Sequence, residues 1–400
     1  MKFDIFLSIC QTEVDGYMPS EKKMFQNFFE QVRFADELGF GTAWVAETHL
    51  SCQIQKENPG SVIPHFKGEI GLNTDILQVA HKVFGQTRHL NVGSAIRNIL
   101  CNGGPIAHAE AIRTFLTLHS VDESEKRLLE IGFAAGRFPF SNTPYGVRPR
   151  NETEKVAWDV VKNKWFQSAT EIFVRFIKGD KFSSQEVSPR YLQASDFREE
   201  ALWQKTQAAY AAETGQKAGD KIPLNPFYEF DRVGVIPFEA PLKNLRLTIG
   251  SHDPEAQILA NQFYPTGVFN LSITPPAVIE EAHKRMRENF HSGGGTWQRD
   301  MMPRTCLVFI DENHEKAKTQ AHKAWENYWR AMEKTLDPKK VEQAVGNATF
   351  GTPEEVLAQM KEKYHKDDRL LLWFDFNNHD SNAVKNSMKL FMEKVAPHLA

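Results

Sequence analysis

Short apolar segments typical of buried strands alternate along the chain with longer segments of helical periodicity, and this alternation constrains the fold more than any other feature. Each strand-like segment precedes a segment in which apolar residues recur at the three- and four-residue spacing of an amphipathic helix. Strands of this kind that alternate with helices indicate a parallel sheet buried on both faces. Eight such units predict an α/β fold, a (β/α)8 TIM barrel, as a single domain over residues 1–400. The predicted strands lie at residues 2–9, 42–47, 90–96, 128–134, 245–250, 267–274, 303–310 and 369–376.

The predicted helices carry recognisable end signals. Ser20 is the expected N-cap of the first helix and Gly39 directly follows it, while Thr352 and Pro353 open a later helix. The alternation fails over residues 179–244, which are rich in Pro, Gly and charge and contain one helical piece at 197–214. We interpret this segment as an insertion that covers the strand tips as a lid, and not as an independent domain. The helices are predicted at residues 20–38, 75–87, 105–118, 152–178, 251–263, 275–289, 314–332, 351–364 and 381–399.

The composition excludes several classes of function. The formal net charge is −3 and the basic residues are scattered, so nothing indicates nucleic-acid binding. No apolar run approaches the roughly 20 residues that span a bilayer. The apolar run at the N-terminus contains Asp4 and is too short for a signal peptide. The four cysteines are dispersed, which favours a reducing cytoplasm.

Polar residues follow several of the predicted strands. Glu47 ends the second strand and His49 opens the loop after it, a polar, aromatic loop at residues 135–150 follows the fourth, and Ser251 and His252 follow Gly250 at the end of the fifth. Loops at the carboxyl ends of the strands surround the active site in parallel barrels, so we predict one site there. No nucleotide-binding glycine motif and no GxSxG elbow is present. Further acids and histidines lie in loops without the spacing of metal ligands, and they are Asp311, Glu312, His314, His379 and Asp380.

Several ordered pieces of the sequence resemble the bacterial luciferase-like, flavin-dependent monooxygenases. The resemblance spans most of the chain and breaks at residues 179–244. No single short motif carries it, and the closing pair of segments is the most specific part. The pieces are AETHL (46–50), LNVGSAI (90–96) with HAE (108–110), GFAAGRFPF (132–140) with YG (145–146), TIGSHDPEAQILANQF (248–263), and GTPEEVLAQMKEKY (351–364) with SMKLFMEKVAPHL (387–399).

The resemblance implies a cytoplasmic oxidoreductase that uses FMN in its reduced form, FMNH2. A separate flavin reductase would supply FMNH2, consistent with the lack of a nicotinamide fingerprint. Dioxygen would then give a flavin C4a-hydroperoxide that oxidises a small organic substrate. The resemblance also implies a homodimer that pairs through helices beside the early strands. The 29 Phe and 8 Trp residues fit either a bulky core or a pocket for a flat ligand, and they do not identify the substrate.

The resemblance places the flavin at three stretches of the chain. Its phosphate would lie at the helix start after the fifth strand, where free N–H groups and the helix dipole favour an anion; the alternative is that Ser251 or Asp253 only caps the helix. A non-proline cis peptide would lie under the flavin ring at Ala95–Ile96, or at Ser94–Ala95 if the register is off by one; the alternative is an ordinary strand end. The candidate cofactor contacts are Ser94, Ala95, Ile96, Gly136, Arg137, Phe138, Arg148, Arg150, Gly250, Ser251 and His252, with Tyr145 as a further candidate in the fourth loop.

Arginines in the fourth loop are the predicted phosphate cations. Guanidinium groups bind phosphate through a bidentate fork, and Arg150 or nearby Arg148 is the better candidate by register. Arg137 lies two residues beyond Ala135, the position at which luciferases carry an arginine. The alternative is that these are solvated loop arginines.

Glu47 and His49 are the predicted catalytic residues. They match an acid and the second of two histidines in the luciferase pattern. Thr48 replaces the first histidine and cannot transfer a proton near neutral pH, so either His49 takes that role or the role is absent. Ala134 stands where luciferase carries its reactive cysteine, and these departures argue against light emission.

Three other functions remain open at this point. One is a deazaflavin-dependent hydride-transfer oxidoreductase. Another is a non-catalytic flavin-binding partner subunit, which the replacement by Thr48 suggests. A barrel without flavin would require trans peptides at both Ser94–Ala95 and Ala95–Ile96.

Overall fold

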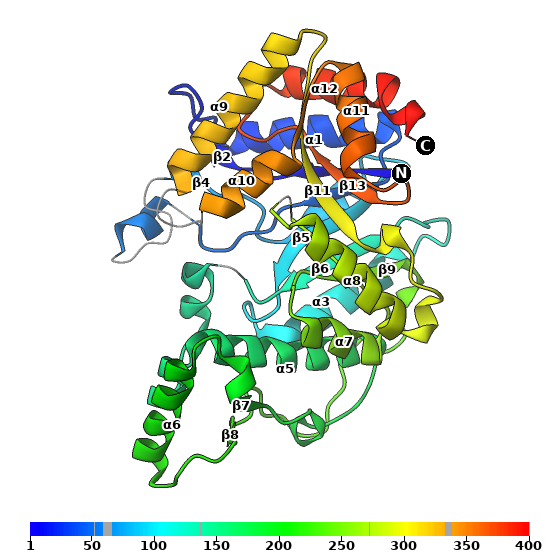
Figure 1. Cartoon of the computed structure of the whole chain (residues 1–400). Helices are drawn as coiled ribbons and strands as arrows, with labels where there is room; N and C mark the ends of the chain where they lie inside the picture. The colour runs from blue at the N-terminus through cyan, green and yellow to red at the C-terminus, as the bar shows by residue number, and fades with distance from the viewer. Residues whose placement is uncertain (52, 59–65, 137, 272, 333–337, 400) are drawn as a thin grey trace.

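The computed structural model describes residues 1–400 except 52, 59–65, 137, 272, 333–337 and 400 (Figure 1). The described parallel strands pair in the order β10-β9-β6-β5-β3-β1-β13-β11-β12. A parallel bridge between Asn270 and Arg304 joins β10 to β11, and the Asn270 N–H donates to Pro303 O at 3.0 Å. This bridge closes eight of the strands into the predicted (β/α)8 barrel. The barrel strands are β1 (Lys2–Leu7), β3 (Thr42–Val45), β5 (Asn91–Asn98), β6 (Leu129–Ala134), β9 (Leu245–Ile249), β10 (Thr266–Val268), β11 (Pro303–Ile310) and β13 (Arg369–Trp373).

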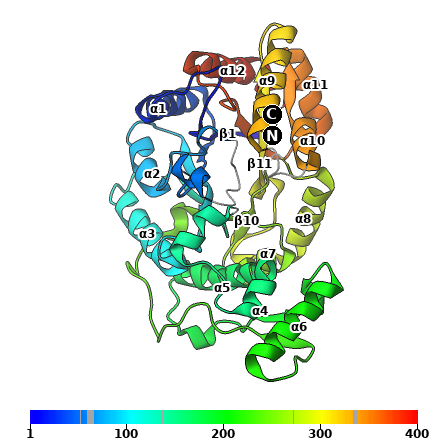
Figure 2. The same ribbon diagram turned by 90° about the vertical axis from the view of Figure 1, so that its left-hand side faces the viewer.

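Helices surround the ring of strands, as a view along the barrel shows (Figure 2). The predicted caps are confirmed: Ser20 Oγ accepts from Lys23 N, Gly39 adopts φ 81°, and Thr352 Oγ1 accepts from Glu355 N. The helices are α1 (Glu21–Leu38), α2 (Ile76–Phe84), α3 (Gly104–His119), α4 (Glu152–Val156), α5 (Trp158–Lys178), α6 (Glu200–Thr214), α7 (Pro254–Phe263), α8 (Pro276–Asn289), α9 (His314–Met332), α10 (Pro338–Asn347), α11 (Pro353–Lys363) and α12 (Ser381–Lys394).

Short strands that the sequence did not predict lie outside the barrel. They form two antiparallel pairs and one parallel addition to β11. One of the pairs joins the loop after β1 to the loop after β3, at the carboxyl end of the barrel. The short strands are β2 (Gln11–Thr12) with β4 (Gly68–Glu69), β7 (Tyr191–Gln193) with β8 (Lys221–Pro223), and β12 (Thr349–Gly351).

The single helix predicted over residues 152–178 is two helices in the structure. The break lies at Ala157, whose φ and ψ are −100° and 22°. Ala157 and Val161 are buried against Trp203 of α6 in a separate apolar cluster. The apolar period continues through the break, so the sequence pattern did not show it. Contact with the inserted segment gives α4 its own direction.

The inserted segment packs beside the barrel. Its helix α6 contacts α4, and Phe227 stacks on Trp165 of α5 with ring centroids 4.9 Å apart. Lys164 of α5 forms an ion pair with Asp196 at 2.9 Å. α6 lies beyond α5 and outside the ring of helices (Figure 2). Apolar side chains of this segment are buried against α4 and α5, while Tyr228 lies beside the loop after β5, where a Cβ on Gly104 would be 3.1 Å from its ring. The expectation that the segment covers the strand tips stays a prediction. The single-domain assignment stays a prediction.

Large apolar side chains fill the barrel interior below the carboxyl ends of the strands. Trp44 is fully buried and lies 5.6 Å from Phe269 between ring centroids. Gly93 on the neighbouring strand makes room for Trp44, since a Cβ there would lie 2.6 Å from the indole ring. Phe6, Ala95 and Leu371 complete this cluster. The interior is therefore a packed core and not a pore. None of the described helices combines the length and apolar character needed to cross a membrane.

Candidate functional site

A bulge in β5 forms the floor of the carboxyl end. The Ala95–Ile96 peptide bond is cis, at the first of the two expected positions, and the pairing with β6 shifts register directly after Ser94. Two glycines on neighbouring strands accommodate this backbone. A Cβ at Gly132 would lie 2.3 Å from Ser94 O, and one at Gly250 would lie 2.3 Å from Ile96 Cδ1. The floor therefore depends on glycines from two further chain segments.

Glu47 lies at the centre of a buried hydrogen-bond network beside this floor. Its Oε1 lies 3.1 Å from His49 Nε2, and its Oε2 accepts from Ser94 Oγ at 3.2 Å. The Asn102 side-chain amide lies 3.0 Å from His49 Nδ1. Both ring nitrogens of His49 therefore have partners, and the pattern fits the tautomer with its proton on Nε2. The structure thus brings the two predicted catalytic residues together and fixes the orientation of the imidazole.

Thr48 packs against the loop after β3. Its backbone N–H donates to Asn73 O at 3.0 Å. A Cβ placed on Gly71 would lie 2.4 Å from Thr48 Oγ1, so the hydroxyl faces this glycine. Thr48 stands where the luciferase pattern has a histidine, and here it makes packing contacts. The imidazole next to it in sequence is that of His49.

Arg97 and His108 form a buried pair that the sequence reasoning did not select. Arg97 Nε donates to His108 Nδ1 at 2.7 Å, and His108 Nε2 lies 2.9 Å from Cys101 O. Burial and the charge of Arg97 lower the pKa of His108 to about 3, so the imidazole is neutral at pH 7. Arg97 Nη1 lies 3.8 Å from Glu47 Oε2 and, within the described chain, is a buried nitrogen without a hydrogen-bond partner. An arginine directly after the apolar strand predicted at residues 90–96 was the available sequence signal.

The loop after β6 reaches the same end of the barrel. Gly136 adopts φ 69°, and a Cβ there would lie 2.1 Å from Asn98 Nδ2, so only glycine fits. Phe138 stacks on Phe140 with ring centroids 5.1 Å apart. Tyr145 approaches His49 edge to face at 6.4 Å. Arg137 lies outside the described residues.

The two predicted phosphate arginines are not gathered at this site. Arg148 is exposed. Arg150 forms an ion pair with Glu154 at 2.5 Å and donates to the carbonyls of Asn225 and Pro226, and its guanidinium lies over Phe227. Arg150 therefore ties the inserted segment to α4. A partner that lies 75 residues away in sequence could not be predicted from the local loop.

The helix start after β9 is capped by Asp253. Its Oδ1 accepts from Glu255 N at 3.0 Å, while its own N–H donates to Ser251 Oγ at 3.2 Å. His252 Nε2 lies 3.3 Å from Thr274 Oγ1, and burial together with the charge of Arg285 lowers the pKa of His252. The capping alternative is thus confirmed for Asp253. Phosphate binding by Gly250, Ser251 and His252 stays a prediction.

Aromatic residues cover part of this end of the barrel. Phe66 and Phe140 are buried together, and Phe138 and Tyr328 pack against them. These side chains come from the loops after β3 and β6 and from α9, which are far apart in sequence. We call them the aromatic cover.

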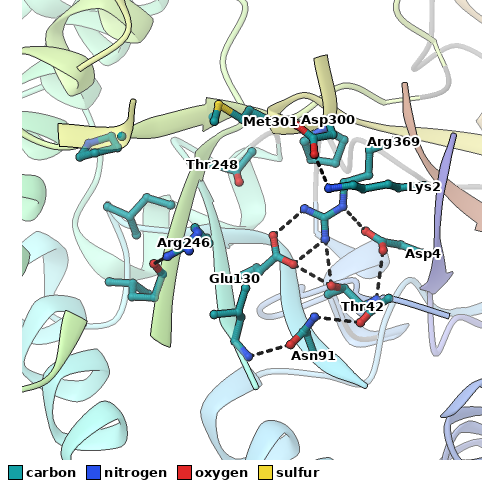
Figure 3. A pocket seen from close by; sticks show the side chains of 18 of the residues that line it. Lys2, Asp4, Thr42, Asn91, Glu130, Arg246, Thr248, Asp300, Met301 and Arg369 are labelled. Carbon is teal, nitrogen blue, oxygen red and sulfur yellow. Dashed lines mark hydrogen bonds and ion pairs between the residues drawn. The ribbon is translucent and has the colours of Figure 1, made fainter. Parts of the chain in front are cut away.

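The amino end of the barrel has a different character (Figure 3). A cavity of about 940 Å³ opens there, and none of the predicted site residues is among its described lining residues. Arg369 donates to Glu130 at 2.5 and 2.8 Å and to Thr42 Oγ1 at 2.9 Å, and its Nε lies 2.6 Å from Asp4 Oδ2. The buried charges of this network bond one another, which suits the stabilising face of a barrel.

Comparisons with known proteins agree with this architecture. Residues 1–157 match the family model described as luciferase-like monooxygenase. None of the curated proteins compared with the chain matches it in sequence.

Several solved structures share the fold along the whole chain. The monooxygenase RslO1 from Streptomyces bottropensis is 17% identical, with 100% of both chains covered and a TM-score of 0.69. The oxygenating constituent of 3,6-diketocamphane monooxygenase from Pseudomonas putida, solved in complex with FMN, is 15% identical, with 99% of this chain and 98% of that chain covered and a TM-score of 0.59. An F420-dependent secondary alcohol dehydrogenase is 14% identical, with 100% and 99% covered and a TM-score of 0.54. At these identities the likeness establishes the fold.

Proposed function

Since residues 1–157 carry a luciferase-like monooxygenase domain, we propose that this protein is a flavin-dependent monooxygenase. It uses reduced FMN and dioxygen to oxidise a small organic substrate. The observation that carries the proposal is the buried Glu47–His49 pair beside the glycine-lined floor at the carboxyl ends of the strands. A carboxylate that orients an imidazole is a common arrangement for proton management at an active site.

The residues at this end fit a flavin. Gly132 and Gly250 make room for the Ser94 carbonyl and the Ile96 side chain at the bulge in β5, the stretch at which the resemblance places the flavin ring. Arg97 Nη1 is a buried donor without a partner within the described chain, and it suits an acceptor oxygen or nitrogen of a ligand. Gly136, Ser251 and His252 are the predicted contacts of the ribityl phosphate. When bound, the flavin supplies the reaction with dioxygen, and the protein supplies orientation and a dry site.

Each group of residues has a task in this proposal. Glu47 holds His49 with its proton on Nε2. Because Asn102 bonds Nδ1, His49 can accept a proton there only after the Asn102 side chain moves. The aromatic cover limits the access of water to the floor. We therefore expect substrate binding to displace the Asn102 side chain and to close the aromatic cover over the floor.

The proposal includes partners and a location. FMNH2 comes from a separate flavin reductase, consistent with the absence of a dinucleotide motif from the sequence. The protein acts in the cytoplasm as a homodimer. The organic substrate is not specified beyond a small molecule.

A second candidate is hydride transfer with the deazaflavin coenzyme F420. The structural likeness to an F420-dependent secondary alcohol dehydrogenase favours it. This function requires no dioxygen. A third candidate, a non-catalytic flavin-binding partner subunit, is favoured by the packing role of Thr48 and by the occupied nitrogens of His49.

Anaerobic titration separates these functions. The intrinsic tryptophan fluorescence of the protein is followed during addition of FMNH2, oxidised FMN or reduced F420, and the flavin complex is then mixed with oxygenated buffer. We expect tight binding of FMNH2 and, with a reductase and a panel of organic substrates, oxygen uptake coupled to product. Preference for F420 without oxygen uptake indicates hydride transfer. Binding of FMNH2 without turnover on any substrate indicates the partner subunit, and no binding of any flavin refutes the proposal.

A further inference from the structure

We propose that Lys162 of α5 is the cation that anchors the phosphate of the flavin ligand. The inference rests on the proposed function and identifies a contact that the sequence reasoning assigned to arginines. Lys162 Nζ donates to Gly136 O at 2.7 Å, so the side chain reaches from the helix to the loop after β6. The next residue, Asn163, donates to Asp253 Oδ2 at 3.0 Å. Two consecutive residues of α5 therefore contact both loops that border this part of the site.

Lys162 differs from the other basic residues of its helix. Lys164 forms ion pairs with Asp196 and Glu255, Arg175 pairs with Glu171, and Lys178 pairs with Asp180; the distances are 2.9, 3.4, 3.5 and 3.3 Å. No described carboxylate forms an ion pair with Lys162. Its hydrogen-bond acceptor is a neutral carbonyl, which leaves the ammonium charge without a counter-charge.

The surroundings of Lys162 disfavour its charge. The side chain is half-buried, and burial lowers the pKa of Lys162, while Cys101 and the exposed Asp159 act in the opposite direction. Burial of Cys101 raises the pKa of its thiol to about 12, so the thiol is neutral and offers no negative charge at pH 7. A half-buried cation without an acid partner is stabilised by a bound anion. A phosphate dianion supplies both the charge and the hydrogen-bond acceptors.

The neighbouring groups suit an anion rather than a cation. Ser251 Oγ and the N-terminus of α7 lie in the adjacent loop, while the Asp253 carboxylate is turned to the amides of Asn163 and Gln167. Gly136 presents backbone without a side chain. Among the described residues of this region, Lys162 is therefore a cation without an acid partner, and the Asp253 carboxylate accepts from amide donors.

The test compares flavins with and without a phosphate. Dissociation constants for reduced FMN and reduced riboflavin are measured anaerobically by fluorescence for the wild type, Lys162→Met and Lys162→Arg. We expect Lys162→Met to weaken FMN binding by about 10- to 100-fold, the range of a charge-assisted hydrogen bond, and to leave riboflavin binding unchanged. Lys162→Arg should restore part of the FMN affinity.

Lys164→Met is the matched control. It lies on the same helix and loses a cation that is already paired, so it should leave the ratio of FMN to riboflavin affinity unchanged. Thermal unfolding of each variant shows whether it is folded. An equal loss of FMN and riboflavin affinity in Lys162→Met, or an unchanged ratio, overturns the assignment while the proposed function stands. If the wild type binds neither flavin, the proposed function fails first and the assignment fails with it.

Discussion

The two ends of the barrel differ in whether their buried charged side chains have partners within the described chain. At the amino end, Arg369 bonds both Asp4 and Glu130, and each acid has further hydrogen bonds (Figure 3). At the carboxyl end, Arg97 Nη1 has no hydrogen-bond partner within the described chain, and no described acid pairs with Lys162. Charges that satisfy one another contribute to a fold, whereas polar groups left without partners suit a ligand. The size of a cavity does not show this difference, because the cavity of about 940 Å³ lies at the amino end.

The pKa values of the two acids at the amino end shift in opposite directions. Burial raises the pKa of Asp4 to about 6, and the charge of Glu130 adds to this, while Arg369 and the Trp44 N–H act against it. Burial also acts to raise the pKa of Glu130, but Arg369 and the hydrogen bonds from Arg369 and Thr42 outweigh it, so the pKa of Glu130 is lowered. Arg369 thus provides the positive charge that stabilises two acids. Without it, both carboxylates would be buried with no cation beside them.

The largest expected effect is on stability at the amino end. Arg369→Met leaves two buried carboxylates without a cation, and we expect it to lower the free energy of unfolding by about 3–5 kcal/mol. Lys2→Met is the matched control, because Lys2 forms an exposed ion pair with Asp300 and its loss should cost about 0–1 kcal/mol. Urea unfolding of both variants measures the difference. Equal costs would contradict the view that the buried network stabilises this end.

The next effect is on catalysis at the carboxyl end. We expect His49→Ala to reduce turnover by about 10²- to 10⁴-fold, the usual contribution of a proton-transfer group, and to leave FMNH2 affinity unchanged. Steady-state kinetics and anaerobic titration measure the two quantities separately. Asn102→Ala is the comparison variant, since it removes the partner of His49 Nδ1 and retains the His49 imidazole. If His49→Ala lowers turnover and affinity equally, His49 positions the flavin or supports the fold.

At neutral pH the smallest effect is a pH dependence of stability, because it develops only as the pH falls below 6.5. The folded pKa of His108, about 3, lies below the ordinary value of 6.5. The contribution of neutral His108 to the free energy of unfolding is therefore complete above pH 6.5 and is lost as the pH falls toward 3. Over this range the free energy of unfolding changes by up to about 1.4 kcal/mol per pH unit. His108→Gln should flatten the curve of unfolding free energy between pH 6.5 and 4.

His283→Gln is the control for this effect. Burial lowers the pKa of His283 to about 4, on α8 and away from the site, so it should flatten the same curve. Only the change at His108 should also affect flavin binding, because Arg97 loses its acceptor. A pH profile unchanged in His108→Gln would mean that other groups produce the acid sensitivity.

Much of the fold could be predicted from local patterns. The strand β11 and the helix α9 begin and end at the predicted residues, because apolar runs and helical periodicity are properties of neighbouring residues. The break at Ala157 could not be predicted in this way, since its cause is contact with α6. Closure of the barrel through Asn270 and Arg304 also joins residues that no local signal connects.

The candidate site was predicted in part. Glu47 and His49 lie where they were expected, because they follow a strand whose position the periodicity predicts, and the Ala95–Ile96 bond within β5 is cis, as the resemblance implied. Arg150 was a reasonable phosphate cation by residue type, but the structure engages it with Glu154 and the inserted segment. Lys162 resembles an ordinary helix lysine in sequence. Its uncompensated charge is visible only when its surroundings are known.

The sequence by itself determined the barrel, the end of it that carries the site, and the acid–histidine pair, because strand periodicity decides which residues follow each strand. The tertiary structure alone decided which charges are compensated. Coulombic and hydrogen-bond partners come from segments far apart in the chain, as Arg369 with Asp4 and Arg150 with Asn225 show. The balance of charge at each end therefore depends on packing, and that balance distinguishes the amino end of this barrel from the end at which we propose that the flavin binds.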